Sequence, residues 1–322
     1  MNRIDNILIT SAGRRVSLLR NFQKTLKKFN PNGKVFAVDL VPELSAACQV
    51  ADGYIAVKRV TEEQYLDELL RYCKDNEISL VVPTIDTELS ILAAARDGFA
   101  EHGIRIVISD KALCDVFYLK SSTFEFFKNH DIDTPRIYEC LEDAQYPLFA
   151  KLDDSSSSIG AGKVYNRTEA FSLLEKNKNY IFQELVEGDE YTCDAFFDHE
   201  SRLISVVPRK RLEVRAGEVS KALAVKDEAI IASLCCLAGK LAGAYGTLTI
   251  QLIKTRDGRI RFIEINPRFG GGYPLSYRAG ADFAEFLIRD YLGEKLDFRN
   301  DWQDGTLMLR YDDEVIVSGG LP

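Results

Sequence analysis

Residues 260–272 of the chain read Ile-Arg-Phe-Ile-Glu-Ile-Asn-Pro-Arg-Phe-Gly-Gly-Gly. The first half alternates as a β-strand does, because successive side chains of a strand point to opposite faces. This alternation predicts two faces, one carrying Arg261, Ile263 and Ile265 and the other carrying Phe262, Glu264 and Asn266. A carboxylate and an amide at this spacing offer two oxygen ligands to a hard cation such as Mg²⁺. The stretch therefore predicts a strand that carries part of a metal site.

A second strand precedes this one and is predicted to pair with it as a hairpin. Residues 247–254 read Thr-Leu-Thr-Ile-Gln-Leu-Ile-Lys, and the Asp-Gly pair at 257–258 is a strong signal for a two-residue turn. Such a turn places Gln251 directly opposite Glu264, with the two Cβ atoms roughly 4.5–5.5 Å apart, and a four-residue loop from Arg256 to Arg259 would keep the same register. Gln251, Glu264 and Asn266 then converge on one face, which we interpret as a cation site. A polar patch on an amphipathic sheet is the alternative interpretation.

The residues after this strand suit a phosphate group. Pro267 cannot donate to a sheet ladder and ends the strand. Arg268 carries a planar guanidinium that matches phosphate oxygens. Residues 270–272 are glycines, which let the backbone approach another group closely. A cation site beside such an arginine indicates a phosphorylated ligand.

Composition and charge narrow the class of protein. The 322 residues are 46% hydrophobic and 28% charged, which is ordinary for a globular chain of this length. The net charge of −8 argues against a nucleic acid or an anionic membrane as partner. The seven cysteines form no Cys-x-x-Cys pair, so neither a zinc site nor a disulfide framework is predicted. The chain shows no signal peptide and no apolar run long enough to span a bilayer, so we expect a cytoplasmic protein.

A homodimer is the assembly to test first, because dimers are the commonest oligomers.

The first third of the chain alternates between predicted strands and helices. Strands are expected at residues 6–10, 34–40, 79–82 and 104–108, with helices between them. That order is typical of a doubly wound parallel sheet with helices on both faces. The turn after the first strand also suggests a dinucleotide-binding motif, but it carries only Gly13 where Gly-x-Gly-x-x-Gly is required. An NAD-dependent enzyme is therefore the weaker interpretation.

Charged residues follow the strands of this region, at the edge where such sheets bind ligands. They are Arg14, Arg15, Asp86 and Glu88. The two acids either favour a helix N-terminus electrostatically or face a ligand, and the two arginines suit either solvent or a substrate. A basic cluster further along leaves a similar choice between a solvated face and a clamp for phosphates and carboxylates. It consists of Arg209, Lys210, Arg211 and Arg215.

The middle of the chain carries a lysine and a loop that suit phosphate. Lys151 lies among apolar neighbours in a predicted strand, residues 146–152, where an isolated ammonium would be costly. Pairing with Asp153 or Asp154 is the structural alternative. Residues 155–162 follow as a serine- and glycine-rich loop, whose N–H and hydroxyl groups suit phosphate oxygens. The loop is not a P-loop, because Gly-Lys-Ser/Thr is absent.

With these pieces in this order the chain resembles the ATP-grasp superfamily. It looks most like the carboxylate–amine ligase branch, which is related to one half of a carbamoyl-phosphate synthase large chain. The resemblance rests on Lys151 with its loop, on Gln-Glu-Leu-Val-Glu-Gly-Asp-Glu at residues 183–190 and on Glu-Ile-Asn-Pro-Arg at residues 264–268. It implies an α/β and α+β fold, in which a doubly wound parallel-sheet domain precedes the two α+β subdomains of an ATP-grasp fold. The expected limits are 1–110 for the N-terminal domain, 111–186 for the small lid subdomain and 187–322 for the C-terminal subdomain with the metal site.

The resemblance also implies a role for each matching residue. Lys120 and Lys151 match lysines that contact the phosphates of ATP, and Arg268 matches the arginine on the γ-phosphate. Lys151 and Arg268 are therefore the catalytic candidates. The other nucleotide-binding candidates are Ser157, Ser158, Gly160 and Gly162 in the closing loop, Glu184, Leu185 and Val186 beside adenine, and Glu190 on the ribose. The implied Mg²⁺ ligands, for which Mn²⁺ is an expected substitute, are Gln251, Glu264 and Asn266.

The implied activity is an ATP- and Mg²⁺-dependent ligation of two small molecules, a carboxylate and an amine. The carboxylate attacks the γ-phosphoryl group to give an acyl phosphate, and the amine then displaces phosphate. The chain resembles a single ATP-grasp unit, which argues against carbamoyl phosphate synthesis because that enzyme carries two. A catalytically inactive or regulatory nucleotide-binding protein is the alternative from another class. The intact metal and phosphate residues argue against it.

Overall fold

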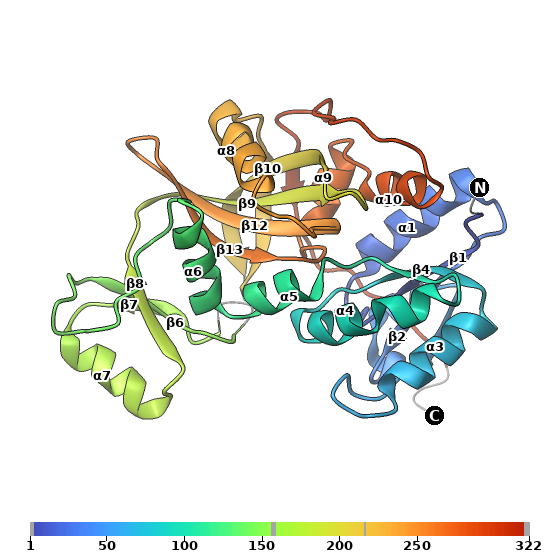
Figure 1. The fold of residues 1–322 in the computed structure, drawn as a ribbon, viewed down its shortest axis with the longest axis horizontal. Coiled ribbons are helices and arrows are strands. Elements are labelled where there is room, and N and C mark those ends of the chain that lie inside the picture. The colour runs from blue at the N-terminus through green and yellow to red at the C-terminus, as the bar shows by residue number, and fades with distance from the viewer. Residues whose placement is uncertain (1–2, 156–158, 216, 319–322) are drawn as a thin grey trace.

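The structure, a computed structural model, describes residues 3–155, 159–215 and 217–318. Three β-sheets divide this described part of the chain (Figure 1). A five-stranded parallel sheet comes first, a three-stranded antiparallel sheet next and a six-stranded antiparallel sheet last. This order confirms the predicted fold class, α/β followed by α+β. None of the described helices is both long and apolar enough to cross a bilayer.

The first sheet has the strand order β3-β2-β1-β4-β5. Its strands are β1 (Asn6–Ile9), β2 (Val35–Asp39), β3 (Gly53–Ala56), β4 (Ile78–Val82) and β5 (Arg105–Ile106). One face is covered by α1 (Val16–Phe29) and α2 (Ala46–Val50), and the other face by α3 (Tyr65–Asp75) and α4 (Asp86–Ala100). A short 3₁₀ turn, η1 (Pro42–Leu44), precedes α2. Strand β1 is apolar on both faces because both are covered by helices. Ile7 and Ile9 pack toward α1, and Leu8 packs toward α3 and α4.

The small sheet lies at the opposite end of the long axis from the first sheet (Figure 1). Its strands, in the order β7-β6-β8, are β6 (Leu148–Leu152), β7 (Gly162–Val164) and β8 (Tyr180–Glu184). Helix α7 (Arg167–Lys176) covers one face and buries Ala170 against Leu148 and Phe182. This unit has its own small core, separate from those of the other two sheets.

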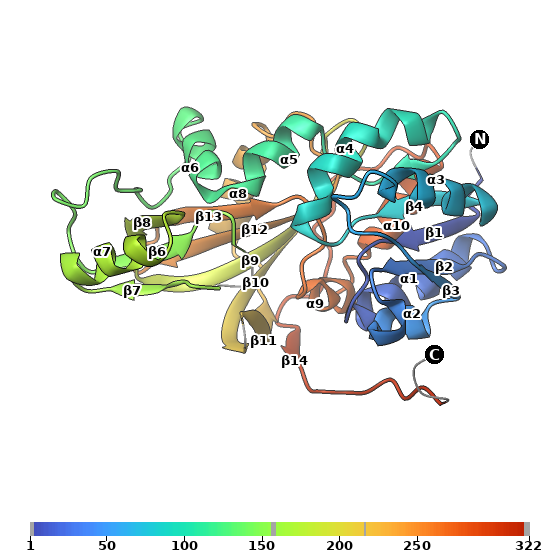
Figure 2. The ribbon, with the colours of Figure 1, turned by 90° about the horizontal axis from the view of Figure 1, so that it is seen from below.

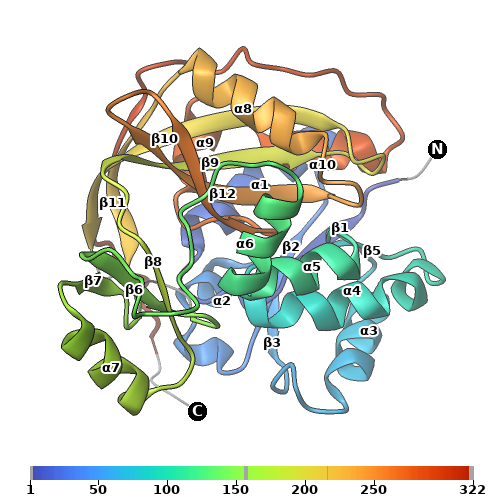
Figure 3. The ribbon, with the colours of Figure 1, turned by 60° about the vertical axis from the view of Figure 1, so that its left-hand side comes forward.

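The six-stranded sheet forms the centre of the molecule (Figure 3). Its strands, in the order β13-β12-β9-β10-β11-β14, are β9 (Gly188–Phe197), β10 (Leu203–Arg215), β11 (Glu218–Ala224), β12 (Gly246–Thr255), β13 (Ile260–Asn266) and β14 (Leu307–Leu309). One core contains side chains of α5 (Lys111–Tyr118), α6 (Lys120–Asn129) and α8 (Glu228–Ala238), and another contains those of α1, α9 (Tyr273–Arg278) and α10 (Phe283–Tyr291). Figure 2 shows these two groups of helices on opposite sides of the sheet. Helices α5 and α6 thus pack on the large sheet, and the domain limits themselves remain a prediction.

The β12–β13 hairpin has a different turn from the one predicted. Thr255 N donates to Arg259 O, so the loop holds three residues, 256–258, rather than two. Gly258 takes a left-handed φ of +87°, which is typical of glycine at the end of a three-residue loop. As a result Leu252 faces Phe262 near the turn.

A β-bulge at Ile263 then restores the predicted register, so that Gln251 does face Glu264. The bulge also corrects the two predicted faces of β13. Phe262 and Ile265 both lie in the core beneath the sheet, whereas Ile263 lines the same cleft as Glu264. The predicted pair is therefore confirmed, although strict alternation along the strand is wrong.

An aromatic contact joins the N-terminal domain to the segment that follows β13. The buried rings of Phe22 on α1 and Phe269 meet edge to face, with their centroids 5.6 Å apart. We expect Phe22→Ala to lower the free energy of unfolding by about 3–5 kcal/mol, because it removes a fully buried ring and leaves a cavity. Urea unfolding measures this change. Phe298→Ala is the matched control, since that ring is 46% exposed, and an equal loss in both variants would contradict the prediction.

Candidate functional site

A cleft of about 1840 Å³ is lined by strands of the two antiparallel sheets and by segments that follow strands of the N-terminal sheet. The small sheet contributes Lys151 from β6, and the large sheet contributes residues of β9 to β13. The N-terminal domain contributes residues 11–15 and 84–87, which follow β1 and β4 at the carboxyl edge of the parallel sheet. The fold therefore brings the ligand-binding edge of the first sheet to the polar face of the last one.

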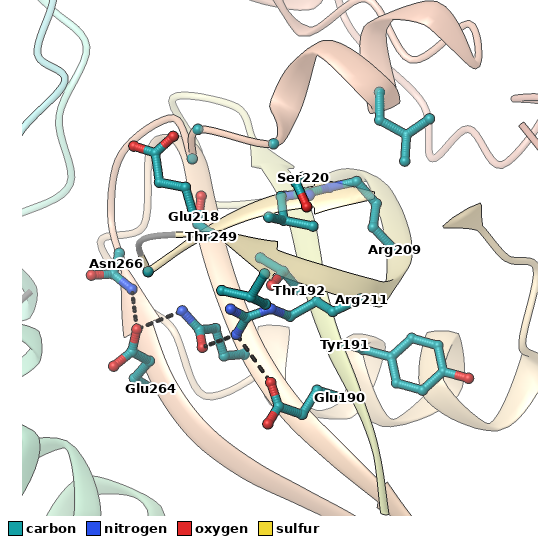
Figure 4. Close-up of a pocket in the computed structure, with 18 of the residues that line it drawn as sticks. Glu190, Tyr191, Thr192, Arg209, Arg211, Glu218, Ser220, Thr249, Glu264 and Asn266 are labelled. Carbon is teal, nitrogen blue, oxygen red and sulfur yellow. Dashed lines mark hydrogen bonds and ion pairs between the residues drawn. The ribbon is translucent and has the colours of Figure 1, made fainter. Parts of the chain in front are cut away.

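Two rows of residues, polar except for Val207, run across neighbouring strands of the large sheet, and Figure 4 labels Thr192, Arg209, Thr249, Glu264 and Asn266 of these rows. Residues directly opposite each other in an antiparallel sheet share a face. The first row consists of Arg209, Thr192, Gln251 and Glu264, and the second of Val207, Asp194, Thr249 and Asn266. Six of these eight residues line the cleft, namely Arg209, Thr192, Gln251, Glu264, Thr249 and Asn266.

The three predicted metal ligands are in direct contact. Glu264 Oε1 accepts hydrogen bonds from Gln251 Nε2 at 2.7 Å and from Asn266 Nδ2 at 3.1 Å. The amide oxygens accept from two arginines, Arg211 Nη1 to Gln251 at 3.4 Å and Arg268 Nη2 to Asn266 at 3.2 Å. If the side-chain amides of Gln251 and Asn266 each turned by 180°, their oxygens would point to the same place as the Glu264 carboxylate oxygen. One carboxylate and two amides fit a hard cation that shares its other ligands with phosphate.

No cluster of three or more His, Cys, Asp and Glu side chains that could hold a metal ion occurs in residues 3–155, 159–215 and 217–318. The site at Glu264 is of another kind, because two of its three oxygens come from amides. Such a site carries a single negative charge and suits a cation that arrives together with a polyanion.

Arg268 lies next to these ligands with one donor unused. Its Nη2 donates to Asp86 Oδ2 at 2.8 Å, which links the start of α4 to the end of β13. Its Nε is buried and has no hydrogen-bond partner in the described part of the chain. A buried donor without a partner costs about 1–3 kcal/mol, so an acceptor such as a phosphate oxygen fits here.

Lys151 is 5% exposed and faces the metal-ligand cluster from the small sheet. Burial lowers the pKa of its ammonium to about 8, against an opposing attraction by Glu264. The alternative, an ion pair of Lys151 with Asp153 or Asp154, does not occur among the described residues, and Asp154 Oδ2 instead accepts from Asn179 Nδ2 at 3.4 Å. The Asp153 carboxylate accepts from Ser121 N at 2.7 Å and from Ser121 Oγ at 2.6 Å. Lys120 Nζ donates to the carbonyl oxygens of Asp153, at 3.2 Å, and of Ser155.

The predicted adenine and ribose residues line the cleft where β8 meets β9. Glu184, Leu185 and Val186 are among its lining residues. The Glu184 side chain pairs with Arg261 Nη2 at 3.0 Å, and this partner lowers the pKa of Glu184 although burial alone would raise it. Glu190 Oε2 lies 3.2 Å from Arg211 Nη1.

The predicted closing loop is described in part. Ser157 and Ser158 lie outside the described residues. Gly160 and Gly162 flank Ala161, which lines the cleft, and Gly162 begins β7. Gly160 has a φ of +71°, a backbone conformation that favours glycine.

Two charged residues of the N-terminal domain are held by contacts within the chain. Arg15 is half-buried at the cleft, and its Nη1 and Nη2 donate to the carbonyls of Phe269 at 3.0 Å and Thr84 at 2.7 Å. Burial and then the charge of Arg268 lower the pKa of Arg15 to about 10. Glu88 is fully buried and accepts from Thr84 N and Ile85 N just before α4, and from Ser11 Oγ after β1, so it ties the start of α4 to the end of β1.

The basic cluster predicted at residues 209–215 divides into separate contacts. Arg209 is 1% exposed and pairs with Asp194, while Arg211 contacts Glu190 and Gln251. Sequence reasoning missed the pair with Asp194, because the partners lie on different strands with no local signal between them. The periodicity of β9 would have placed Asp194 on the polar face.

Comparisons with known protein families match two consecutive stretches of the chain. Residues 7–107 match the family described as the PylC-like N-terminal domain, and residues 119–272 match the ATP-grasp domain family. The phosphoribosylamine–glycine ligase of Halalkalibacterium halodurans is 24% identical over 281 residues, which are 76% of this chain and 64% of that protein. The chain thus spans less than two thirds of this relative.

Solved structures show the same fold at low identity. The biotin carboxylase domain of Hydrogenobacter thermophilus 2-oxoglutarate carboxylase aligns with a TM-score of 0.74 and 17% identity, over 95% of this chain and 74% of that one. The N5-carboxyaminoimidazole synthetase of Staphylococcus aureus, solved with ADP, has a TM-score of 0.74 and 12% identity, over 97% and 95% of the two chains. The chain therefore carries an ATP-grasp domain over residues 119–272, with a PylC-like N-terminal domain over residues 7–107 ahead of it.

Proposed function

We propose that the chain is an ATP- and Mg²⁺-dependent ligase that activates a small-molecule carboxylate as an acyl phosphate and joins it to an amine. The observation that carries this proposal is the cluster of Gln251, Glu264 and Asn266 between two cationic side chains, Lys151 and Arg268. Positive groups on both sides of a cation site suit a polyphosphate held between two sheets. The names of the related ligases support the same reaction class.

The nucleotide would lie along the cleft between β8 and the end of β13. Its adenine would lie beside Glu184, Leu185 and Val186, its ribose at Glu190 and its phosphates at Lys120, Lys151 and the 155–162 loop. Arg268 would take the γ-phosphate through its unpaired Nε. The Mg²⁺ ligands would be Gln251, Glu264 and Asn266, and Mn²⁺ is expected to substitute.

Catalysis in this arrangement is positioning and charge stabilisation rather than covalent chemistry. When bound, the cation would neutralise oxygens of the phosphate that is transferred. Lys151 and Arg268 hold that phosphate from opposite sheets, so that a substrate carboxylate can approach it in line. The carboxylate oxygen forms a bond to phosphorus as the bond to ADP breaks, and the amine then attacks the acyl carbon and releases phosphate. The enclosing loops exclude water from the acyl phosphate.

ADP release with a pool of acids and amines tests the ligase directly. We expect ADP to accumulate only when ATP, Mg²⁺ and both substrates are present, because the amine is needed to complete turnover. The pool contains the proteinogenic amino acids, acetate and succinate, and mass spectrometry identifies the amide. Tight ATP binding without ADP release from any pool would instead indicate a nucleotide-binding protein without catalysis.

Self-association is part of the same proposal. We expect a homodimer, because small-molecule enzymes of this size commonly assemble as dimers. Sedimentation equilibrium measures the mass in solution, and a concentration-independent mass of one chain would contradict this expectation.

A further inference from the structure

Arg209 carries a buried guanidinium that its ion pair satisfies only in part. Its Nε and Nη2 donate to the two oxygens of Asp194 at 2.8 and 3.0 Å, and Ser276 Oγ donates to the same carboxylate at 2.5 Å. Nη1 is buried and has no hydrogen-bond partner among the residues that the structure describes. An unpaired buried donor costs about 1–3 kcal/mol, so the ion pair alone does not account for this arginine.

The unpaired nitrogen points at the glycine run that follows β13. A Cβ atom on residue 272 would lie 2.0 Å from Arg209 Nη1, so glycine is required there. Gly270, Gly271 and Gly272 line the same cleft as Arg209 itself. The free nitrogen of the guanidinium therefore lies against Gly272, directly behind the glycine run that lines the cleft.

The donors beside the glycine run favour an anionic ligand. A guanidinium has donors only, so the partner of Nη1 must be an acceptor, and a planar fork suits a carboxylate. The neighbouring wall is also cationic. Arg14 and Arg310 each donate to one oxygen of Glu218 at 2.7 Å, and Arg310 also donates to Gly271 O at 2.5 Å. Because these two arginines share the single carboxylate of Glu218, this wall carries a net positive charge although the whole chain has a net charge of −8.

The place of Arg209 in the sheet separates it from the nucleotide phosphates. Arg209 and Gln251 belong to one cross-strand row, with Thr192 of β9 between them. Two strand spacings put the backbones of Arg209 and Gln251 roughly 10 Å apart. A ligand group bound at Arg209 would therefore be too far from Gln251 to belong to the phosphate at the proposed metal site. The separation matches the length of a small substrate that lies beside that phosphate.

We propose that Arg209 binds, through Nη1, an acidic group of the acid substrate other than the carboxylate that is activated, while Asp194 and Ser276 hold the guanidinium in place. The ligand class is a small carboxylic acid, and Arg14 and Arg310 favour one with a further acidic group. This inference rests on the proposed ligase function, because it assigns the acid to that reaction.

Matched lysine substitutions test this assignment. Arg209→Lys keeps a cation beside Asp194 and removes the nitrogen that faces the glycine run. Arg105→Lys is the control, because Arg105 Nη1 also pairs with a buried aspartate, Asp290, at 3.3 Å, and neither residue lines the cleft. The substrate is the acid of the pool that gives the fastest ADP release with the wild type, and thermal unfolding checks that both variants fold.

We expect Arg209→Lys to raise the KM for this acid about tenfold or more, with the KM for MgATP unchanged within about twofold, because a charge-assisted hydrogen bond is lost. Arg105→Lys should change neither constant. An equal rise in both variants, a rise in the KM for MgATP alone, or no change in Arg209→Lys would overturn the assignment.

A wild type that releases no ADP would contradict the ligase proposal, and binding then tests Arg209 separately. The probe is the same acid pool, added to protein with Mg²⁺ and the non-hydrolysable analogue AMP-PNP. An increase in Tm for the wild type and Arg105→Lys, but not for Arg209→Lys, would support an acid site at Arg209. No increase in Tm for the wild type, or an equal one in Arg209→Lys, would overturn it.

Discussion

Replacing Glu264 by alanine is expected to lower the rate of ADP release about a hundredfold or more. Glu264 supplies the carboxylate of the candidate cation site and accepts from both amides of that site, Gln251 at 2.7 Å and Asn266 at 3.1 Å. Without it the two amides lose their common partner, and a cation would meet no charged ligand. Preorganised charge at a transferring phosphate typically accounts for a factor of this size. Steady-state ADP release at saturating ATP and Mg²⁺ measures the effect.

The fold of this variant should be intact, because Glu264 lies at the surface of the cleft and not in the apolar core. Glu213→Ala is the matched control, since Glu213 lies on the same sheet, is exposed and contacts Lys221 at 2.7 Å outside the cleft. Control and variant should have similar far-UV circular dichroism. Turnover of Glu264→Ala at the control rate would show that the cation binds elsewhere.

Replacing Lys151 by methionine is expected to raise the Kd for AMP-PNP about tenfold to a hundredfold. The substitution keeps the length of a side chain that is 5% exposed, so the main loss is one charge-assisted contact to phosphate. Isothermal titration with Mg²⁺ present measures the affinity. Lys176→Met on α7 is the control, because it removes an exposed lysine of the same subdomain. An unchanged Kd in Lys151→Met would remove Lys151 from the phosphate site.

The lowered pKa of Lys151 adds a pH dependence to this result. Burial lowers that pKa to about 8 in the free protein, so the ammonium is charged below pH 8 and loses its proton above it. Nucleotide phosphates favour the charged form, and binding above pH 8 must therefore take up a proton. The Kd should be flat below about pH 8 and rise by up to about tenfold per pH unit above it. Lys151→Met should lack this rise, and the same slope in both proteins would assign it to another group.

Local patterns in the sequence predict most of the fold and the centre of the site. The alternating β12 and β13 residues predict the pairing of Gln251 with Glu264, and the alternation of strands and helices predicts the parallel sheet. The turn was predicted wrongly because an Asp-Gly pair fits both a two-residue and a three-residue loop. A bulge at Ile263 compensates for the extra residue, and nothing in the local pattern signals a bulge.

Contacts between distant segments could not be predicted from the sequence. The pair of Arg268 with Asp86 joins residues that are 182 positions apart, and Arg15 reaches the carbonyl of Phe269 across 254 positions. These contacts depend on how the N-terminal sheet docks on the large one, which no strand or helix pattern encodes. The unpaired edge of Arg209 depends in addition on Gly272, whose lack of a side chain is meaningful only once the two are adjacent.

The most direct test is a crystal structure with Mn²⁺ and AMP-PNP, in which the anomalous signal locates the metal. We predict a peak roughly 2.0–2.3 Å from one oxygen each of Gln251, Glu264 and Asn266, with both amides turned over relative to the free protein. The γ-phosphate of AMP-PNP should lie against Arg268 in the same crystal. A manganese peak elsewhere in the cleft, or amide groups that still donate to Glu264 beside a bound nucleotide, would contradict the account.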